Sequence, residues 1–503
     1  MATIYTRKNA WNKGGTFDNP DLLWYAIAVG EMQSRALKDE TSWWFYAGIH
    51  GYNWVNLPTP PSIPKGPEPT SGQITQFWNQ CQHGTWFFLP WHRGYLYALE
   101  KVLRGIIQEK GGPADWALPY WNYFGPNTQY QIPPAFTTLT LPDGRPNPLL
   151  VNARYGPQNN GNIFIPLAAW NINQDCQKDI SFEGEQPDYY GGSATSFEHS
   201  GYADRGSIED NPHNFVHVAI GGRGGLMSNP RTAALDPIFY IHHCNIDRMW
   251  AEWNESGKDN PQRYAWLNGP TATGDRKFYI PNPDKSAWEF TPAMVRNITK
   301  LGYNYEEIAS IELRPLFNRR AKRLRRIGLP LAEAENFRMM TKKANSELVG
   351  ASSTSLSVGT SGSRTNVKLE NKSWKKVNKS FKKFRTLESF ANFSEKNTPD
   401  EMYLQLEGVR GKEDSIVCTV SVNQSYVGHI SFFGLQNATE KDQTHGGGGL
   451  TIKLDITKIV DELQLSGEED VRNLDVLIQP LNMVSKEDEF TVDRISIYRK
   501  PVE

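Results

Sequence analysis

The sequence is poor in three features that would each define a class of protein. It has no run of 18 apolar residues, so no membrane-spanning helix is predicted. The formal net charge of the 503 residues is −1, which leaves no strong field to attract nucleic acid or anionic lipid. Four cysteines in a chain of this length do not form a disulfide scaffold. We therefore expect a soluble globular protein without a nucleic-acid or membrane partner.

The N-terminal segment "MATIYTRKNAWNKGG" also lacks the apolar core of a signal peptide. Together with the few cysteines, this makes a cytoplasmic location the default expectation.

The length and the uneven composition predict more than one domain. Residues 1–312 are rich in Trp and Pro and hold eight of the ten histidines. A basic run, "RPLFNRRAKRLRR", and a Ser/Gly-rich stretch, "SELVGASSTSLSVGTSGSR", follow, and they predict a flexible linker over 313–365. A solvated, protease-accessible segment explains the basic run better than nucleic-acid binding does. In 366–503, segments such as "EMYLQLEGV" and "DRISIYRK" alternate apolar and polar residues, which predicts an antiparallel β-sandwich.

Three predicted helix starts in the first domain carry histidines, which makes that domain mainly α-helical. In "DNPHNFVHVAI", Asn211 can cap the helix and Pro212 suits its first position. His213 and His217 then lie one turn apart on the same face, as two nitrogen ligands of one metal would. In "FLPWHRGYLYALEKVL", a proline again opens the helix and His92 lies in the first turn.

The third helix start, "LDPIFYIHHCNIDRMW", has Asp236 as its cap and two adjacent histidines. Neighbours on a helix diverge by about 100°, so only one of His242 and His243 can face a site shared with the pair above. A lone histidine in such a segment is more often a core residue than a ligand. The recurrence of the same helix start three times nevertheless predicts a metal site.

The missing motifs narrow the choice of metal. The sequence has no HExxH motif, no repeated ExxH motif and no CxxC pair. Ligand sets made only of imidazole suit copper. Two copper ions, each held by three neutral imidazoles, can deliver two electrons to O₂ together. We therefore predict two copper ions as the cofactor and O₂ as a co-substrate.

"PHNFVH" followed by "DPIFYIHHCNIDRMW" resembles the copper B signature of the type 3 dicopper family, which includes tyrosinases, catechol oxidases and molluscan haemocyanins. The resemblance implies a helical catalytic core around the two ions. It implies copper B ligands at His213, His217 and His243, with His242 and Asp236 supporting the ligands from behind. It implies copper A ligands at His83, His92 and His50, the last being the candidate offered by "WFYAGIHGYNW".

The same resemblance implies further roles near the metals. Cys81, two positions before His83, matches the spacing of a cysteine that forms a thioether with the ligand in some relatives; the alternative is a free buried thiol. Glu209 and Asn214 match a pair that holds a water near copper B in monophenol-hydroxylating relatives; the alternative is a helix-terminus glutamate and a solvated asparagine. Pro230 replaces the small apolar gate residue of many relatives.

The implied activity is that of a tyrosinase, which hydroxylates small monophenols at the ortho position and oxidises o-diphenols to o-quinones. The alternatives are a catechol oxidase without monophenolase activity and a haemocyanin-like oxygen carrier. The tyrosines of "GYNYE" resemble the motif that closes the catalytic domain in relatives, and the C-terminal domain resembles the shielding domain of latent enzymes. We therefore expect a latent proenzyme in which the hairpin "NQSYVGHISFFG" covers the active site, with Tyr426 as the candidate plug.

Overall fold

The computed structural model describes residues 4–52, 62–184, 189–197, 199, 205–274, 276–308, 319–328, 346–385, 399–441, 447–467, 472–482 and 485–501. The chain forms two compact units, and each is described by itself. The first unit consists of Met1–Glu312 together with Glu413–Ile416 and Ser431–Gly446. The second consists of Leu313–Lys412, Val417–Ile430 and Gly447–Glu503. Two short segments from the C-terminal part of the sequence thus belong to the unit that carries most of the histidines.

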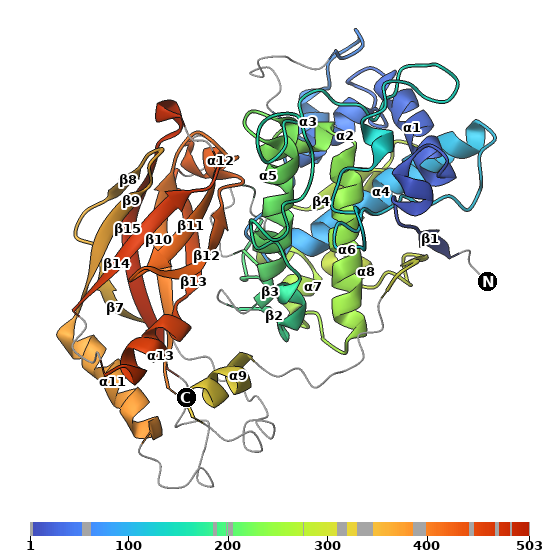
Figure 1. Ribbon diagram of the computed structural model, residues 1–503. Coiled ribbons are helices and arrows are strands. Elements are labelled where there is room, and N and C mark those ends of the chain that lie inside the picture. Colours follow the sequence, from blue (N-terminus) through green and yellow to red (C-terminus); the bar gives the residue numbers. More distant parts are fainter. Residues whose placement is uncertain are drawn as a thin grey trace. The chain divides into compact units, whose positions relative to one another are not determined.

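The first unit is mainly helical (Figure 1). Its α-helices are α1 (Pro20–Gln33), α2 (Trp43–His50), α3 (Ser71–Phe77), α4 (Phe88–Glu109), α5 (Phe215–Gly221), α6 (Ile238–Glu255), α7 (Tyr264–Leu267), α8 (Pro292–Val295) and α12 (Leu435–Thr439). Short strands form three two-stranded pairs: β1 (Tyr5–Arg7) with β6 (Tyr303–Tyr305), β2 (Ser181–Glu183) with β3 (Tyr189–Gly192), and β4 (Phe278–Pro281) with β5 (Ala287–Phe290). The expectation of a mainly α-helical first domain is confirmed.

Helices α4 and α6 form the centre of this unit. The predicted buried stripe of α4 is present, since Leu96, Leu99, Leu103 and the residues between them on that face are buried. Pro90 lies in the first turn of α4, where a missing N–H removes no helical hydrogen bond. Nearly every residue of α6 is buried. Over the ranges that the structure describes, no helix combines the length and apolarity needed to cross a membrane.

A buried network of charged and tyrosine side chains joins α4 and α6 to the paired strands β1 and β6. Arg7 donates to Glu100 of α4 at 2.8 Å and to Asp247 of α6 at 3.1 Å. The hydroxyls of Tyr303 and Tyr305 donate to the same Asp247 carboxylate at 2.6 and 2.5 Å. Because strand β1 pairs in parallel with β6, Arg7 lies beside Tyr305 in the register. The network fixes the relative position of the helices that carry His92 and His243.

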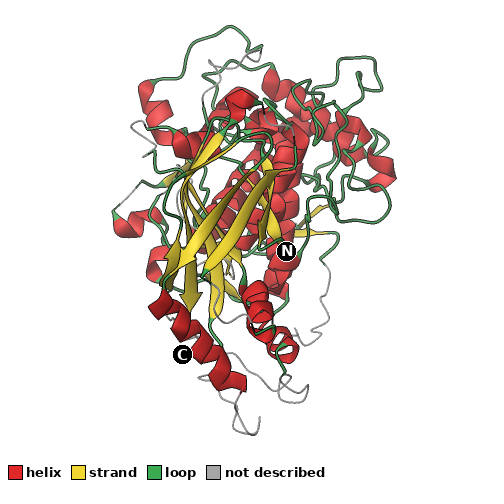
Figure 2. Ribbon diagram, turned by 60° about the vertical axis from the view of Figure 1, so that its left-hand side comes forward, coloured by secondary structure: helices red, strands yellow, loops and turns green. Residues whose placement is uncertain are grey.

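The second unit is built on one nine-stranded sheet (Figure 2). Its strands are β7 (Glu347–Ala351), β8 (Leu356–Val358), β9 (Ser363–Leu369), β10 (Glu401–Arg410), β11 (Val417–Val422), β12 (Ser425–Ser431), β13 (Leu450–Asp455), β14 (Asn473–Pro480) and β15 (Phe490–Lys500). The order is β12-β11-β14-β9-β7-β15-β10-β13, with β8 beside β15. A Cβ atom at Gly428 of β12 would lie 3.5 Å from Leu454 of β13, so the two ends of the sheet approach each other. The expected β domain is confirmed, as a sheet nearly closed into a barrel.

Three helices accompany this sheet: α9 (Arg319–Arg326), α11 (Asn371–Arg385) and α13 (Thr457–Leu465). Helix α11 buries Trp374, Val377, Phe381 and Phe384, which recur every three or four residues and form one apolar face.

The expectation of a flexible linker over 313–365 is wrong for 346–365, which forms β7, β8 and the start of β9. At Gly350 the missing side chain allows close strand packing, because a Cβ atom there would lie 2.3 Å from the carbonyl oxygen of Lys368. Part of the basic run is also ordered in helix α9. There Arg323 is buried and pairs with Asp461 at 2.9 Å. The remaining parts of the expected linker, 313–318 and 329–345, lie outside the described residues.

Candidate metal centre

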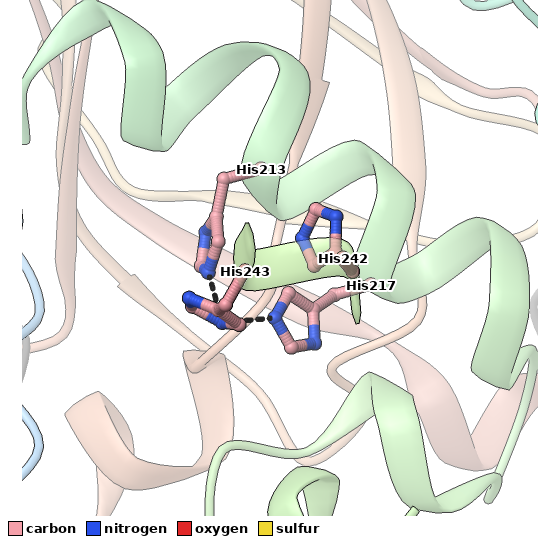
Figure 3. A group of neighbouring side chains, drawn as sticks. All are labelled: His213, His217, His242 and His243. Carbon is pink, nitrogen blue, oxygen red and sulfur yellow. Dashed lines mark hydrogen bonds between the residues drawn. The ribbon is translucent and has the colours of Figure 1, made fainter. Parts of the chain in front are cut away.

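Four buried histidines, His213, His217, His242 and His243, form the first of two clusters, here called cluster B (Figure 3). His213 lies in the π-helical segment η5 (Glu209–Asn214) and His217 in α5, which follows it directly; the two are here called the α5 pair. The other two histidines are adjacent residues of α6. The Nε2 atom of His243 is 3.3 Å from the Nε2 atoms of both His213 and His217. Two metal–imidazole bonds of about 2.0–2.1 Å at a tetrahedral angle place their nitrogens about 3.3 Å apart. The Nε2 atom of His243 is therefore spaced from each of the other two as ligands of one ion are.

The other ring nitrogens of the α5 pair are held by neighbouring acceptors. His213 Nδ1 lies 2.9 Å from the side-chain oxygen of Asn214, and His217 Nδ1 lies 2.8 Å from the carbonyl oxygen of Met227. An Nδ1–H that donates to oxygen leaves the lone pair on Nε2, which is the tautomer that a metal requires there. The backbone and Asn214 thus orient both rings before any ion binds.

His242 belongs to the same cluster but differs from His243 in the contacts of its ring nitrogens. Its ring centre lies 5.0 Å from that of His217 and 5.4 Å from that of His213. Neither of its ring nitrogens has a hydrogen-bond partner in the part of the chain that the structure describes. The short Nε2 contacts with the α5 pair belong to His243 instead. The assignment of His243 as ligand and His242 as its support stays a prediction, and these contacts favour it.

The second cluster, here called cluster A, consists of the buried His50, His83 and His92. His50 is the last residue of α2, His92 lies in the first turns of α4, and His83 lies in the loop between α3 and α4. The Nε2 atoms of His50 and His92 are 3.4 Å apart, and their Nδ1 atoms each lie 2.8 Å from a backbone oxygen, of Pro230 and Phe88 respectively. His83 Nε2 is buried without a partner among the described residues. All three candidate copper A ligands therefore lie together.

The two clusters adjoin. The rings of His92 and His243 stack with centroids 4.3 Å apart and an interplanar angle of 14°, and those of His83 and His213 are 5.9 Å apart. Burial lowers the pKa of every histidine in both clusters, to about 3 for His92 and His217. Neighbouring imidazoles add to the fall for all of them except His217. Neutral imidazoles are the form that binds metal. The six expected ligands fit a pair of copper ions.

Glu209 lies beside cluster A and Asn214 beside cluster B. Both belong to the π-helical segment η5 (Glu209–Asn214) and both are buried. The Glu209 carboxylate accepts the N–H of Gly84, the residue after His83, at 2.8 and 3.0 Å. Burial raises the pKa of Glu209 to about 8, against the opposing charge of Arg205. Asn214 uses its oxygen on His213, while its Nδ2 has no hydrogen-bond partner in the described chain and remains able to donate.

Cys81 lies in the same aromatic segment, and its contacts introduce a residue that the sequence did not single out. The buried thiol sulfur lies 3.3 Å from Nδ1 of His199, and that same nitrogen lies 2.9 Å from the carbonyl oxygen of Cys81. Burial raises the pKa of this thiol well above its usual range. The thioether with His83 stays a prediction. His199 could not be found from the sequence, since it is a single histidine outside any helical spacing.

Asp236 stabilises the start of α6, which carries cluster B histidines, and Pro230 contacts a histidine of cluster A. Asp236 accepts the N–H of Ile238 at 3.0 Å, which caps the start of α6, and pairs with the buried Arg154 at 2.6 Å. Pro230, the expected gate, presents its carbonyl oxygen to His50 Nδ1. Pro230 lies between the cluster B residues His217 and His243 in the sequence, yet its carbonyl oxygen positions His50 of cluster A.

Two aromatic residues of the hairpin in which a plug was predicted have different surroundings. Tyr426 is 50% exposed, and its hydroxyl lies 3.0 Å from His429 Nδ1. The aromatic ring at the clusters belongs to Phe433, seven residues further along the same hairpin and within the first unit. Phe433 stacks on His217 with centroids 4.3 Å apart and an interplanar angle of 28°. Its ring also meets those of His213 and His83 at 5.7 and 5.9 Å. Composition alone did not separate the two aromatic residues.

Residues 431–441, here called the docked segment, make polar contacts with Arg205, Asn229 and Arg231 of the first unit, among others. Arg205 donates to the backbone carbonyl of Phe433 at 2.9 Å. The side chains of Asn229 and Gln436 hydrogen-bond at 2.9 Å, and Arg231 pairs with Glu440 at 2.6 Å. Asn229 and Arg231 flank Pro230, so the docked segment binds the same loop that positions His50.

Comparison with known proteins identifies the family. The model of the common central domain of tyrosinase matches residues 40–256, and a domain of unknown function matches 345–500. Tyrosinase HcTyr1 of Hahella sp. (strain CCB-MM4) is 32% identical over 517 residues, covering 98% of this chain and 99% of that protein. Latent apple tyrosinase has a similar fold, with a TM-score of 0.58 and 19% identity over 99% of this chain and 98% of that one. Latent aurone synthase, a polyphenol oxidase, gives 0.59 and 21% over 100% and 90%.

The fold and the two histidine clusters define a type 3 copper protein. The chain belongs to the tyrosinase family, and it is a copper oxidoreductase of the tyrosinase and polyphenol oxidase type.

Proposed function

We propose that the enzyme hydroxylates small monophenols at the ortho position and oxidises the resulting o-diphenols to o-quinones, with O₂ as co-substrate. When bound, the copper pair supplies two-electron chemistry with O₂. His50, His83 and His92 would hold one ion, and His213, His217 and His243 the other. The remaining steps depend on where the chain holds a phenol ring and where it takes the phenol proton.

The observation that carries monophenol hydroxylation is the buried Nδ2 of Asn214, which has no hydrogen-bond partner among the described residues and lies in the same segment as Glu209. An amide donor and a carboxylate acceptor can hold one water between them, and that water can take the proton of a phenol and pass it to Glu209. The pKa of Glu209, raised to about 8, is near the pH range at which such a proton is exchanged. The positive charge of bound copper would favour its ionised form.

The position of the Phe433 ring indicates where the ring of a phenolic substrate would bind. It stacks on His217 and meets one histidine of each cluster at its edges, which is where a planar phenol ring would contact both metal sites. A substrate can reach this place only after Phe433 has left it. We therefore propose that the full chain is latent, with Phe433 as the plug. A tethered plug acts at an effective concentration of order millimolar, so it competes strongly with a free phenol.

Oxygen uptake with a monophenol and no catechol primer tests the main proposal. Uptake supports the hydroxylase, turnover restricted to catechols indicates a catechol oxidase, and no turnover of either by copper-loaded protein indicates an oxygen carrier. Glu209→Gln keeps an oxygen that can accept from Gly84 but removes the ionisable carboxylate. It should lower monophenol turnover by about 10²–10⁴-fold and leave catechol turnover largely intact.

A matched pair of variants tests latency. Phe433→Ala should raise catechol turnover by at least about tenfold without proteolysis, since it empties the plug position. Tyr426→Ala, from the same hairpin but half-exposed, should leave turnover unchanged. Equal activity of wild type and Phe433→Ala at matched copper content would contradict the plug.

A further inference from the structure

Phe433 of the docked segment has the same carbon skeleton between its ring and its carbonyl group as one class of phenolic substrate. From its ring, the chain runs through Cβ and Cα to the carbonyl carbon, so the carbonyl is carried by the third carbon from the ring. The ring occupies the position stacked on His217, and the carbonyl oxygen accepts from Arg205 at 2.9 Å. A free phenol with the same ring position and a three-carbon acid chain would place its carboxylate at Arg205.

Arg205 is built to hold such a group. Its side chain is buried, and Nη1 lies 3.8 Å from the carboxylate of Asp210 while Nη2 donates to the docked segment. Guanidinium groups present a planar pair of donors that matches a carboxylate, and a bond to an anion is stronger than a bond to a neutral carbonyl. The amide carbonyl of Phe433 is therefore a weaker partner for Arg205 than a substrate carboxylate would be.

We propose that Arg205 is a specificity residue that selects phenols bearing a carboxylate on the third carbon of a para side chain, the 3-(4-hydroxyphenyl)propanoates. This inference rests on the proposed function, because it names the substrate class of that same site. The docked segment occupies the same two positions, the ring position at His217 and the acyl position at Arg205. Such substrates compete with the docked segment for both positions at once.

The test compares two substrates in the copper-loaded full chain: 3-(4-hydroxyphenyl)propanoate and its neutral analogue 4-propylphenol. Both need the docked segment to leave, so the equilibrium of undocking cancels in the ratio of their kcat/KM values. In the wild type the acid should be favoured. Arg205→Gln should lower the ratio by about 10–100-fold, the value of a lost hydrogen bond to a charged group. The loss should appear in KM, because the carboxylate is remote from the reacting carbon.

Two variants separate recognition from undocking. Gln436→Ala removes the contact with Asn229 and should raise turnover of both phenols while leaving their ratio unchanged. Arg205→Lys keeps the cation but loses the planar pair of donors, so it should retain part of the preference for the acid. As a readout without turnover, 3-phenylpropanoate should inhibit wild type competitively and Arg205→Gln about tenfold or more weakly.

The outcomes are distinct. An unchanged substrate ratio in Arg205→Gln, or an equal fall of kcat for both phenols, overturns the role of Arg205 while leaving the proposed function in place. Absence of turnover for both phenols and for catechol in wild type and Gln436→Ala is instead a failure of the proposed function.

Discussion

The two histidine clusters are assembled in different ways. Cluster B takes its expected ligands from the starts of two helices, and the α5 pair is separated by one helical turn. Cluster A takes one histidine from the end of α2, one from a loop and one from α4, and the two with contacting Nε2 atoms are 42 residues apart in sequence. Local helix geometry therefore brings the α5 pair together, whereas only tertiary contacts bring together the ligands of cluster A.

Two of the contacts that hold cluster A come from the part of the sequence that carries cluster B. Pro230 presents its carbonyl oxygen to His50, and Glu209 accepts the N–H of Gly84 beside His83. The difference teaches that cluster A depends on the region of cluster B for its geometry. The reverse dependence is weaker, since the Nδ1 partners of His213 and His217, Asn214 and Met227, are local.

The largest expected effect is the loss of one metal ion. His243→Ala removes the nitrogen that meets both members of the α5 pair, so copper content should fall by about half. His242→Ala should keep both ions with an affinity altered by about 10–100-fold at most, since supporting residues tune a site of this kind by that amount. Metal analysis after dialysis checks both variants. The reverse result would exchange the roles of the two histidines.

Asp247 is the centre of the buried network that fixes the helices of both clusters, so its substitution should destabilise the fold. Burial by itself would raise the pKa of this carboxyl, but Arg93 and Arg7 outweigh burial and hold it below its usual range. Asp247→Ala removes the charged partner shared by the buried Arg7 and Arg93 and should lower the free energy of unfolding by about 3–5 kcal/mol. Chemical denaturation measures this. The control Glu289→Gln alters a largely exposed pair with Lys277 and should leave the midpoint within error.

Because the folded-state pKa of Asp247 is lowered, its stabilising contribution is present at neutral pH and is lost only as the pH falls through the acidic range. The wild type should therefore lose stability in acid more steeply than the Asp247→Ala variant, in which that contribution is already absent. Parallel acid-unfolding curves for the two proteins would contradict this role.

Substitutions of Glu209 test whether cluster A depends on the region of cluster B for its geometry. Glu209→Ala removes the acceptor for Gly84 and should weaken copper binding at cluster A by about 10–100-fold, with cluster B unchanged. Glu209→Gln retains an acceptor and should bind both ions nearly as the wild type does. Titration with a competing chelator distinguishes the two sites. Equal weakening of both ions in Glu209→Ala would remove the asymmetry between the clusters.

The smallest effect concerns the pH dependence of the docked segment. Asp414 is buried in the first unit and accepts the N–H of Gln436 at 2.7 Å. Burial raises its pKa to about 8, with Glu413 and Glu440 adding to the rise and Arg231 opposing it. The docked form thus binds a proton that the undocked form releases, so docking is strongest in mild acid and weakens as the pH rises towards 8.

Asp414→Asn keeps an oxygen that can accept from Gln436 but cannot ionise. The ratio of wild-type to Asp414→Asn turnover should therefore rise between pH 5 and pH 8. Taking the ratio at each pH removes the pH dependence of the chemistry itself. A flat ratio would show that Asp414 does not control docking.

The sequence alone determined the features that depend on local periodicity. The helix starts, the one-turn spacing of His213 and His217, the alternation of the C-terminal strands and the resemblance to dicopper proteins were all visible without a structure. These signals are strong because helix and strand geometry repeats over a few residues, so a short segment specifies which side chains share a face.

Tertiary structure decided the features that depend on contacts between distant segments. The meeting of His50 with His83 and His92, the bond from the Gly84 N–H to Glu209, the contact of Cys81 with His199 and the stacking of Phe433 on His217 join residues with no common periodicity. The Ser/Gly-rich stretch suggested a linker because small residues favour flexibility when isolated. In the sheet they instead allow strands to approach, as Gly350 does against Lys368, and only the neighbouring strand shows which of these roles applies.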